Sequence, residues 1–282
     1  MFHRFLATAL IGSALLSGCA PLPTAQDVSA LEASVQSQTS LAEAVADPRR
    51  TATNIARDRY RHPLETLSFF GVEPDDTVVE IWPAGGWYTE ILAPYLSGRG
   101  RLILATSDGQ LGGVSKLRDA HPALYGSVTT GVFPAFDASA ARVPDSSADV
   151  VLTFRNVHNW RMGARHPQKQ DYSADAFRQM FAMLKPGGVL GVVDHRLPES
   201  ASLERETKSG YMKVSTVRRL AEQAGFSFAG ASEINANPLD TADWPSGVWT
   251  LPPNYALKDQ DRARYQAIGE SDRMTLKFVK PR

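Results

Sequence analysis

Apolar runs of strand length alternate with helix-length amphipathic patterns from residue 49 to the end of this 282-residue chain. Runs rich in Val, Ile and Leu that alternate with helices are typical of strands buried on both faces of a parallel sheet. The pattern therefore predicts an α/β fold with a doubly wound, mostly parallel, seven-stranded sheet and helices on both faces. The expected strands are 77–81, 101–105, 127–133, 148–154, 189–194, 226–234 and 274–279, and the expected helices are 52–70 (broken at His62-Pro63), 87–96, 114–120, 174–184 and 215–224.

The segment 77–92, TVVEIWPAGGWYTEIL, combines a strand, a turn of small residues and the start of a helix. Its apolar run ends at Glu80, passes through Pro83-Ala84-Gly85-Gly86 and returns to helical periodicity at Trp87. Small residues let a backbone approach a ligand closely, and the N–H groups at a helix start attract anionic groups. Ligands of such sheets bind at the carboxyl ends of the strands. The turn therefore predicts a site for a nucleotide-like cofactor.

The first residues have the pattern of an export signal. Arg4 precedes an apolar core, 6–16, that is too short to span a membrane, and the segment ends in Leu16-Ser17-Gly18-Cys19. This ending resembles the lipobox of bacterial lipoproteins, in which a signal peptide, here 1–18, is cut before a cysteine that is then lipidated. We expect an exported, periplasm-facing lipoprotein that is anchored to a membrane through Cys19. The alternative is an ordinary secretory signal with a chance cysteine.

Composition narrows the function further. Cys19 is the single cysteine, so no disulfide supports the exported domain. Lys+Arg and Asp+Glu both number 30, and this absence of basic excess argues against nucleic acid as a partner. Residues 19–48 are rich in Ala, Ser, Gln and Pro, which predicts a tether followed by weak helices. The expected globular domain is therefore 49–282. The sequence does not indicate its oligomeric state.

Several short motifs follow the first strand, and their order and spacing resemble those of one superfamily. They are Asp137-Ala138, Val143-Pro144-Asp145, Ser147-Ala148-Asp149, His158, Leu184-Lys185-Pro186-Gly187-Gly188 and Ala224-Gly225-Phe226. In this order and spacing they resemble the class I S-adenosylmethionine-dependent methyltransferases over about residues 77–279. The longer segments EIWPAGGWYTEILAPYL, VVLTFRNVHNW and LKPGGVLGVVDHR are similar to those of a family of predicted, often exported methyltransferases without an established substrate. The resemblance implies an antiparallel last strand.

The resemblance also implies S-adenosylmethionine as the cofactor and suggests residues for its methionine end. Glu80 stands where the superfamily places an acid near that end, and the backbone of Ala84, Gly85 and Gly86 would lie against the ligand. The superfamily's turn usually reads Gly-x-Gly-x-Gly, whereas Trp82 and Ala84 occupy the first two of these positions here. Trp82 either lines the cofactor pocket or fills it.

Other positions match the rest of the cofactor. Thr106 stands at the end of the second strand, where the superfamily usually has an acid for the ribose hydroxyls, and Asp108 follows two residues later. Asp137, which precedes Ala138, matches an acid that often contacts the adenine amine. Arg61 lies before the first strand, where its guanidinium could cap the cofactor's carboxylate or simply belong to an exposed helix face.

A polar cluster directly follows the very apolar strand 148–154, and buried core is an improbable environment for it. The superfamily commonly places acceptor-side groups at this edge. A histidine can take the proton that a nitrogen or oxygen acceptor loses during methyl transfer. The candidate catalytic residues are Arg155, Asn156, His158 and, one strand later, His195.

Two further expectations concern the last third of the chain and metals. Segment 235–273 is too long for a hairpin loop, and its aromatic residues and prolines predict an ordered lid insertion that shapes the acceptor pocket. The histidines are scattered and no Cys/His pair has ligand spacing, so no metal site is expected.

The favoured function is therefore an enzyme, an S-adenosylmethionine-dependent methyltransferase acting on an unidentified small-molecule acceptor. The alternative is a non-catalytic ligand-binding lipoprotein on the same fold. Export favours this alternative, because S-adenosylmethionine is made in the cytoplasm. A nicotinamide dehydrogenase is disfavoured, since the chain has no Gly-x-Gly-x-x-Gly.

Overall fold

The computed structural model describes residues 39–107 and 111–282, and residues 39–282 form one compact unit. The proposed signal peptide, the lipidation site Cys19, most of the expected tether and the candidate ribose ligand Asp108 lie outside the described residues. Within the described part of the chain, no helix has both the length and the apolar character that crossing a bilayer requires.

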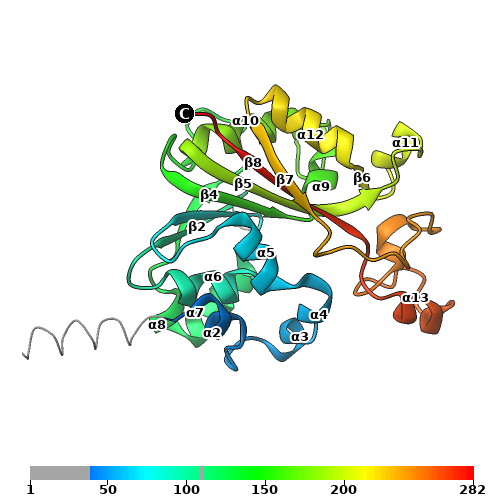
Figure 1. The fold of residues 1–282 in the computed structure, drawn as a ribbon, viewed down its shortest axis with the longest axis horizontal. Helices are drawn as coiled ribbons and strands as arrows, with labels where there is room; N and C mark the ends of the chain where they lie inside the picture. The colour runs from blue at the N-terminus through cyan, green and yellow to red at the C-terminus, as the bar shows by residue number, and fades with distance from the viewer. Residues whose placement is uncertain (1–38, 108–110) are drawn as a thin grey trace, which may run out of the picture. The chain divides into compact units, whose positions relative to one another are not determined.

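An eight-stranded sheet runs through the unit (Figure 1). Its main path has the order β3-β2-β1-β4-β5-β8-β7, and a short β6 pairs with β5 off this path. β8 runs antiparallel to both of its neighbours, and every other pair is parallel. The strands are β1 Thr77–Ile81, β2 Arg101–Thr106, β3 Thr129–Val132, β4 Ala148–Phe154, β5 Leu184–Leu197, β6 Met212–Lys213, β7 Ser227–Ser232 and β8 Arg273–Val279. The predicted fold class is confirmed, with the two-residue β6 added.

Helices cover both faces of the sheet. Those on one face include α5, α6 and α2, and those on the other include α9, α10 and α12 (Figure 1). The helices before β4 are α2 Leu41–Val45, α3 Ala52–Ile55, α4 Asp58–Arg61, α5 Pro63–Phe70, α6 Thr89–Leu96, α7 Gly112–Ala120 and α8 Pro122–Tyr125. Those after β4 are α9 Val157–Arg161, α10 Ser173–Met183, α11 Leu203–Glu206, α12 Val214–Gln223, the 3₁₀ helix η1 Gly247–Thr250 and α13 Arg262–Ile268.

The two large cores follow from the alternation of side chains along each strand. Val78 faces the α5–α6 side and Val79 faces the α10–α12 side, and both are fully buried. Each large apolar side chain buried in this way stabilises the fold by roughly 1.5–3 kcal/mol. Because both faces are covered, the central strands are continuously apolar, which is why the sequence pattern predicts them well.

The predicted break in helix 52–70 has a clear local cause. His62 adopts a left-handed conformation with φ of 40°, and Pro63 opens α5 at the position where its missing N–H costs no hydrogen bond. A second break divides the remainder into α3 and α4. The backbone turns at His62 present Arg61 toward the sheet edge, where it is buried.

Strand β5 is longer than the expected 189–194. It continues because β8 pairs with it as far as His195 opposite Arg273, and β6 then pairs with Arg196 and Leu197. These partners are distant in sequence, so local alternation could not indicate the extension. The extension carries His195 to the carboxyl end of the sheet.

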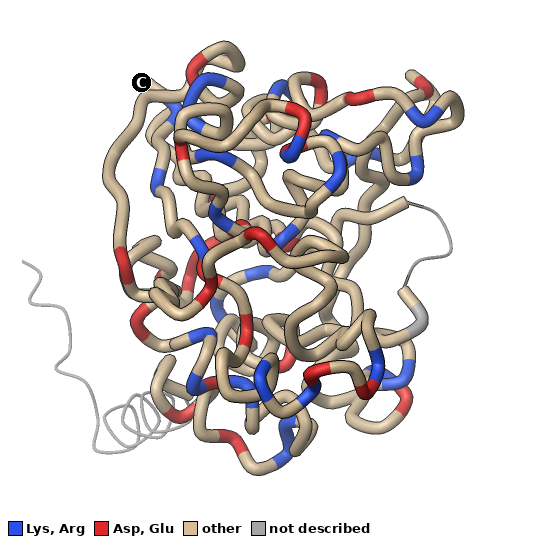
Figure 2. Tube along the Cα trace, turned by 90° about the vertical axis from the view of Figure 1, so that its right-hand side faces the viewer, with Lys and Arg blue, Asp and Glu red and all other residues tan. Residues whose placement is uncertain are grey.

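Residues 235–273 contain η1 and α13 and build a small apolar cluster of their own against the end of β5. The carboxylate of Asp240 fastens the segment, because it accepts hydrogen bonds from the Tyr211 hydroxyl and from Nε1 of Trp244. In the view of Figure 2, acidic and basic positions are interspersed along the chain rather than gathered by sign.

Candidate functional site

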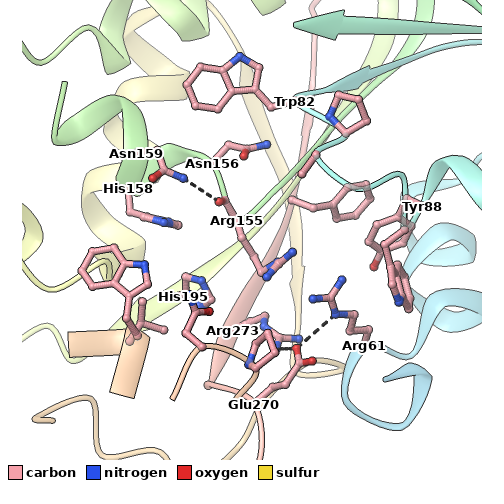
Figure 3. A pocket seen from close by; sticks show the side chains of 18 of the residues that line it. Arg61, Trp82, Tyr88, Arg155, Asn156, His158, Asn159, His195, Glu270 and Arg273 are labelled. Atoms are coloured by element: carbon pink, nitrogen blue, oxygen red, sulfur yellow. Dashed lines mark hydrogen bonds and ion pairs between the residues drawn. The ribbon is translucent and has the colours of Figure 1, made fainter. Parts of the chain in front are cut away.

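A cavity of about 290 Å³ opens at the carboxyl edge of the sheet (Figure 3). The ends of β1, β4 and β5 and the end of α4 form one part of its wall. The turn after β1 and residues 155–165 after β4 also line it, and segment 235–273 contributes Trp249, Pro252, Pro253 and Glu270 among others. Ligand sites in parallel α/β sheets lie at this edge. The cavity is therefore the candidate functional site.

Four non-glycine residues of its wall have backbones in the left-handed region. Trp82, Ala84, Arg155 and Arg165 have φ values of 50°, 52°, 63° and 66°. A non-glycine residue in this region is strained and persists where surrounding contacts enforce it, and such residues cluster at functional sites. At Trp82 and Ala84 the strain has a sequence correlate, because these are two of the positions where the superfamily's turn usually has glycine.

His158 and Asp194 form a buried pair beside the cavity. Nδ1 of His158 lies 2.8 Å from Oδ1 of Asp194, and the backbone N–H groups of His158 and His195 also donate to this carboxylate, at 3.0 and 2.8 Å. A carboxylate partner holds the proton on Nδ1 and leaves Nε2 as the basic nitrogen. His158 lines the cavity, so the pair has the arrangement of a general base.

His195 lies next to this pair and has a different character. Its ring centroid is 5.0 Å from that of His158, and its Nδ1 is 2.5 Å from the Ser271 hydroxyl. Burial lowers the pKa of His195 well below its usual range, and the nearby His158 and Arg273 lower it further. His195 is therefore neutral near pH 7 and can accept or donate one hydrogen bond toward the cavity.

A cluster of charged residues closes the opposite side of the cavity. The Glu270 carboxylate accepts hydrogen bonds from Nε of Arg57 at 2.5 Å, from Nε of Arg61 at 3.2 Å and from Nη2 of Arg273. Burial alone would raise the pKa of Glu270, but Arg273, Arg61 and Arg57 outweigh it and hold this pKa at about 2. Glu270 is therefore ionised at physiological pH.

Arg155 extends from the end of β4 into the space between the histidines and this cluster (Figure 3). Among the described residues, none forms a hydrogen bond or ion pair with its guanidinium. Burial, followed by the charge of Arg273, lowers the pKa of Arg155 to about 10. Nη2 of Arg61 and Nε of Arg273 are also buried without a partner in the described chain. Those two nitrogens are covered by protein, so Arg155 is the residue that offers the cavity a guanidinium without an acceptor among the described residues.

Trp82 forms the wall on the β2–β3 side. Its Nε1 donates to the carbonyl of Phe133 at 2.9 Å, and its ring lies edge-on to Trp160 with centroids 6.1 Å apart. The guanidinium carbon of Arg165 lies 3.9 Å from the centroid of the Trp82 ring. The indole is only 6% exposed. Trp82 thus both lines the cavity and belongs to the core on the α10–α12 side.

Glu80, at the end of β1, is buried beside the turn. Burial raises its pKa to about 7, although a hydrogen bond of 2.6 Å from the Thr89 hydroxyl opposes this. A group that titrates near neutrality can match a cationic ligand by losing its proton.

The small residues of the turn also have a packing role. A Cβ on Gly86 would lie 2.8 Å from Cδ1 of Leu117, and a Cβ on Gly113 would lie 2.8 Å from Cα of Gly85. Helix α7 therefore packs directly on the turn, which partly explains its glycines without a ligand.

The structure brings together about half of the candidate residues. The cavity wall contains Glu80, Ala84, Arg61, Arg155, Asn156, His158 and His195, whereas Gly85, Gly86, Thr106, Asp137 and Ala138 are not part of it. Thr106 is buried at the end of β2. Asp137 is exposed and accepts hydrogen bonds from the N–H and hydroxyl of Ser139, at 2.8 and 2.9 Å. Trp82 closes the cavity on the side that these residues occupy.

Sequence reasoning missed four residues of this site. Asp194, Glu270, Arg273 and Arg165 were not candidates, although the first three are buried charges. Asp194 carried a usable signal, because it is an acid after an apolar run, like Glu80. Glu270 and Arg273 flank the start of the last strand, where charges beside an apolar run could have drawn attention. Arg165 carried no such signal.

His158, Asp194 and His195 also offer ligand atoms within 4.8 Å of one another, an arrangement that can hold a metal ion. Two features oppose a cation here. The oxygens of Asp194 already accept three hydrogen bonds, and the neighbouring guanidinium groups repel positive charge. The absence of a metal remains a prediction of the sequence.

Comparisons with known proteins establish the fold. No family model and no curated protein matches the chain. Among solved structures, an S-adenosylmethionine-dependent methyltransferase from Aquifex aeolicus matches 86% of this chain and 100% of its own, at 12% identity and a TM-score of 0.52. The fold is that of the S-adenosylmethionine-dependent methyltransferases.

This fold does not by itself determine the reaction. The [4+2]-cyclase SpnF matches 94% of this chain and 99% of its own, at 15% identity and a TM-score of 0.54. Different chemistries thus share this architecture, and function has to be argued from the residues of the site.

Proposed function

We propose that this protein is an S-adenosylmethionine-dependent methyltransferase that acts on a small molecule, with His158 as the general base. The observation that carries the proposal is the His158–Asp194 pair, which presents a basic Nε2 to a cavity at the carboxyl end of β4. The alternative is a ligand-binding protein without methyl transfer, and the core packing of Trp82 favours it.

The cavity fits the methionine end of the cofactor better than its adenosine end. Arg61 lines the cavity with a guanidinium that suits a carboxylate, while Glu80 suits an ammonium group. For adenine, the wall offers the face of Trp82 that Arg165 now covers, rather than Thr106 or Asp137. We propose that adenine stacks on this face after Arg165 moves aside.

The cofactor supplies a methyl group carried on a sulfonium. The residues on the opposite side orient the acceptor and remove its proton. His158 accepts a proton at Nε2 from the acceptor's hydroxyl or amine, and Asp194 stabilises the resulting imidazolium. Asn156 is held by hydrogen bonds from its Nδ2 to the Ile81 carbonyl and the Thr153 hydroxyl, which fixes the start of α9, the helix that carries His158. Segment 235–273 excludes water from this side of the cavity.

Calorimetry of the purified protein with S-adenosylmethionine and S-adenosylhomocysteine tests the proposal. We expect both to bind, and we expect His158→Gln to bind S-adenosylhomocysteine as the unaltered protein does. Adenosine and methionine as separate ligands show which end carries the affinity, and we expect methionine to bind and adenosine to bind more weakly. Absence of binding at millimolar S-adenosylhomocysteine would contradict methyl transfer and leave the ligand-binding alternative.

The general base has its own test once an acceptor is found. Removing a general base typically slows the reaction by about 10²–10⁴-fold. We expect His158→Gln to lose this much activity while the affinity for S-adenosylhomocysteine is retained. Arg178→Gln is the control, because Arg178 is an exposed residue of α10 outside the cavity wall.

We also propose, from the sequence alone, that the protein is an exported lipoprotein anchored through Cys19. Cys19→Ser should move it from the membrane fraction to the soluble fraction and remove the mass of the lipid. Unchanged fractionation of this variant would contradict the anchor.

A further inference from the structure

We propose that the methyl acceptor is a small organic acid whose carboxylate is bound by Arg155. That the bound acid is a methyl acceptor rests on the proposed function, whereas the anion site itself rests on the described residues. Charge, unused hydrogen-bond donors and position each support the anion site.

The charge around the cavity is strongly unbalanced. Arg57, Arg61, Arg155 and Arg273 gather around one carboxylate, Glu270. Asp194 is already paired with His158. The cluster therefore has an excess of three positive charges. S-adenosylmethionine does not relieve this excess, because its single carboxylate is outweighed by an ammonium and a sulfonium. An anionic second ligand would relieve it.

Arg155 also has unused hydrogen-bond donors. Its half-buried guanidinium lines the cavity and has no hydrogen bond or ion pair with another described residue. Arg273 is 2% exposed, two of its nitrogens donate to the Tyr60 carbonyl and to Glu270, and its Nε is covered by protein, so it contributes charge rather than a contact. A charged donor without an acceptor gains from an anionic ligand, and a planar carboxylate can satisfy two guanidinium N–H groups at once.

Position separates this anion from the carboxylate of the cofactor. Arg61 reaches the cavity from α4, on the side of Tyr88, whereas Arg155 reaches it from the β4 end that also carries His158 (Figure 3). A carboxylate at Arg155 therefore leaves the rest of the acceptor beside the histidine. There the ring of Trp249 stands edge-on to His158, with centroids 6.3 Å apart, and offers an apolar wall.

The acceptor class follows from these neighbours. It is a small acid with a carboxylate at one end, an apolar body that packs on Trp249, and a hydroxyl or amine within reach of Nε2 of His158. The cavity volume of about 290 Å³ fits a molecule of this size better than a macromolecular substrate.

Benzoate and benzamide are a matched probe pair, because they share a ring and differ in charge. Calorimetry and thermal melting of the full chain should detect benzoate binding and no comparable benzamide binding. Arg155→Gln should weaken benzoate binding by about tenfold or more, since a hydrogen bond to a charged group is lost. Arg155→Lys keeps the charge without the planar pair of donors and should give an intermediate affinity. Arg178→Gln, on an exposed position of α10, should bind as the unaltered protein does.

S-adenosylhomocysteine is the second arm of the experiment and separates the two possible sources of the carboxylate. We expect Arg155→Gln to retain its affinity for S-adenosylhomocysteine. If this variant loses S-adenosylhomocysteine and keeps benzoate, Arg155 holds the cofactor and the inference is wrong. Equal binding of benzoate and benzamide would also overturn it. Benzoate binding without S-adenosylhomocysteine binding would instead uphold the anion site and contradict methyl transfer. If Arg155→Gln does not fold, the benzoate and benzamide pair and the Arg155→Lys variant still decide whether Arg155 binds the carboxylate.

Discussion

The two halves of the sheet's carboxyl edge are built differently. On the β2–β3 side, the Trp82 indole is packed in the core and its N–H is paired with Phe133. On the β4–β8 side, Nη2 of Arg61, Nε of Arg273 and the cavity-lining guanidinium of Arg155 have no acceptor among the described residues. The polar groups of the first half are paired within the protein, whereas the second half leaves charged donors without a protein acceptor among the described residues.

This difference indicates where stability and function reside. Packed aromatic rings lower the free energy of the folded state, and their removal is costly whether or not a ligand is present. Unpaired buried charges raise the free energy of the unliganded protein, and a ligand that pairs them recovers that cost. Substitutions on the Trp82 side should therefore change the free energy of unfolding whether or not a ligand is present. Substitutions around Arg155 and Glu270 should change how strongly the protein binds anions and is stabilised by them.

The largest effect is expected at Trp82. Trp82→Gly removes a large core side chain, although glycine suits the local φ of 50°, and should lower the free energy of unfolding by about 3–5 kcal/mol. Trp82→Phe keeps a ring under Arg165 and should lower the free energy of unfolding much less. Denaturant titration measures both. A loss below about 1 kcal/mol for Trp82→Gly would mean that the ring is not part of the core.

Glu270→Gln should have the next largest effect. It removes the carboxylate that forms ion pairs with Arg57, Arg61 and Arg273. Removing one partner of a buried ion pair costs about 3 kcal/mol or more. Added benzoate or phosphate should restore more stability to this variant than to the unaltered protein, as thermal melting in each salt can measure.

Glu233→Gln is the matched control for Glu270→Gln. Glu233 is an exposed partner of Arg196, and its removal should change stability by about 0.5 kcal/mol or less. An equal response of both variants to added anion would contradict a ligand site in the Glu270 cluster.

Glu80 should make stability depend on pH. Its folded pKa of about 7 lies above the ordinary 4.5, so the folded state binds the extra proton between these values. The stabilising contribution is fully present below pH 4.5 and is lost as the pH rises through 7. The side chain introduced by Glu80→Gln cannot ionise. Between pH 5 and pH 8 the free energy of unfolding of this variant should therefore rise by about 2 kcal/mol relative to that of the unaltered protein. A stability difference that does not change with pH would contradict this.

The smallest effect is expected at Arg165. Its guanidinium lies over the Trp82 ring and is otherwise only 3.5 Å from the Ser107 hydroxyl. Arg165→Gln should lower the free energy of unfolding by about 0.5–1 kcal/mol. A double-mutant cycle with Trp82→Phe measures the interaction free energy between Arg165 and the ring at position 82. If adenine stacks on Trp82, Arg165→Gln should retain or improve affinity for S-adenosylhomocysteine, and a large loss would contradict stacking there.

Several features of the fold and site could be predicted from local patterns. The apolar strands β1 and β4 have the predicted bounds, because burial on both faces makes each one a continuous apolar run. Glu80, Arg155 and His158 were found because each follows such a run. Asp194 ends an apolar run too and carried the same signal. Arg273 could not be placed in the site in this way, since its position opposite His195 depends on the pairing of β8 with the extended β5.

The sequence by itself determined the alternation of strands and helices, the break at His62-Pro63 and the polar residues that end β1 and β4. These depend on side-chain periodicity and on the restricted backbone of proline, which act within a few residues. Only the tertiary structure decided that Arg61 meets Glu270, 209 positions away, and that Trp82 turns its ring into the core. Contacts of this kind arise when the chain closes on itself, and no local pattern records which distant groups will then share one cavity.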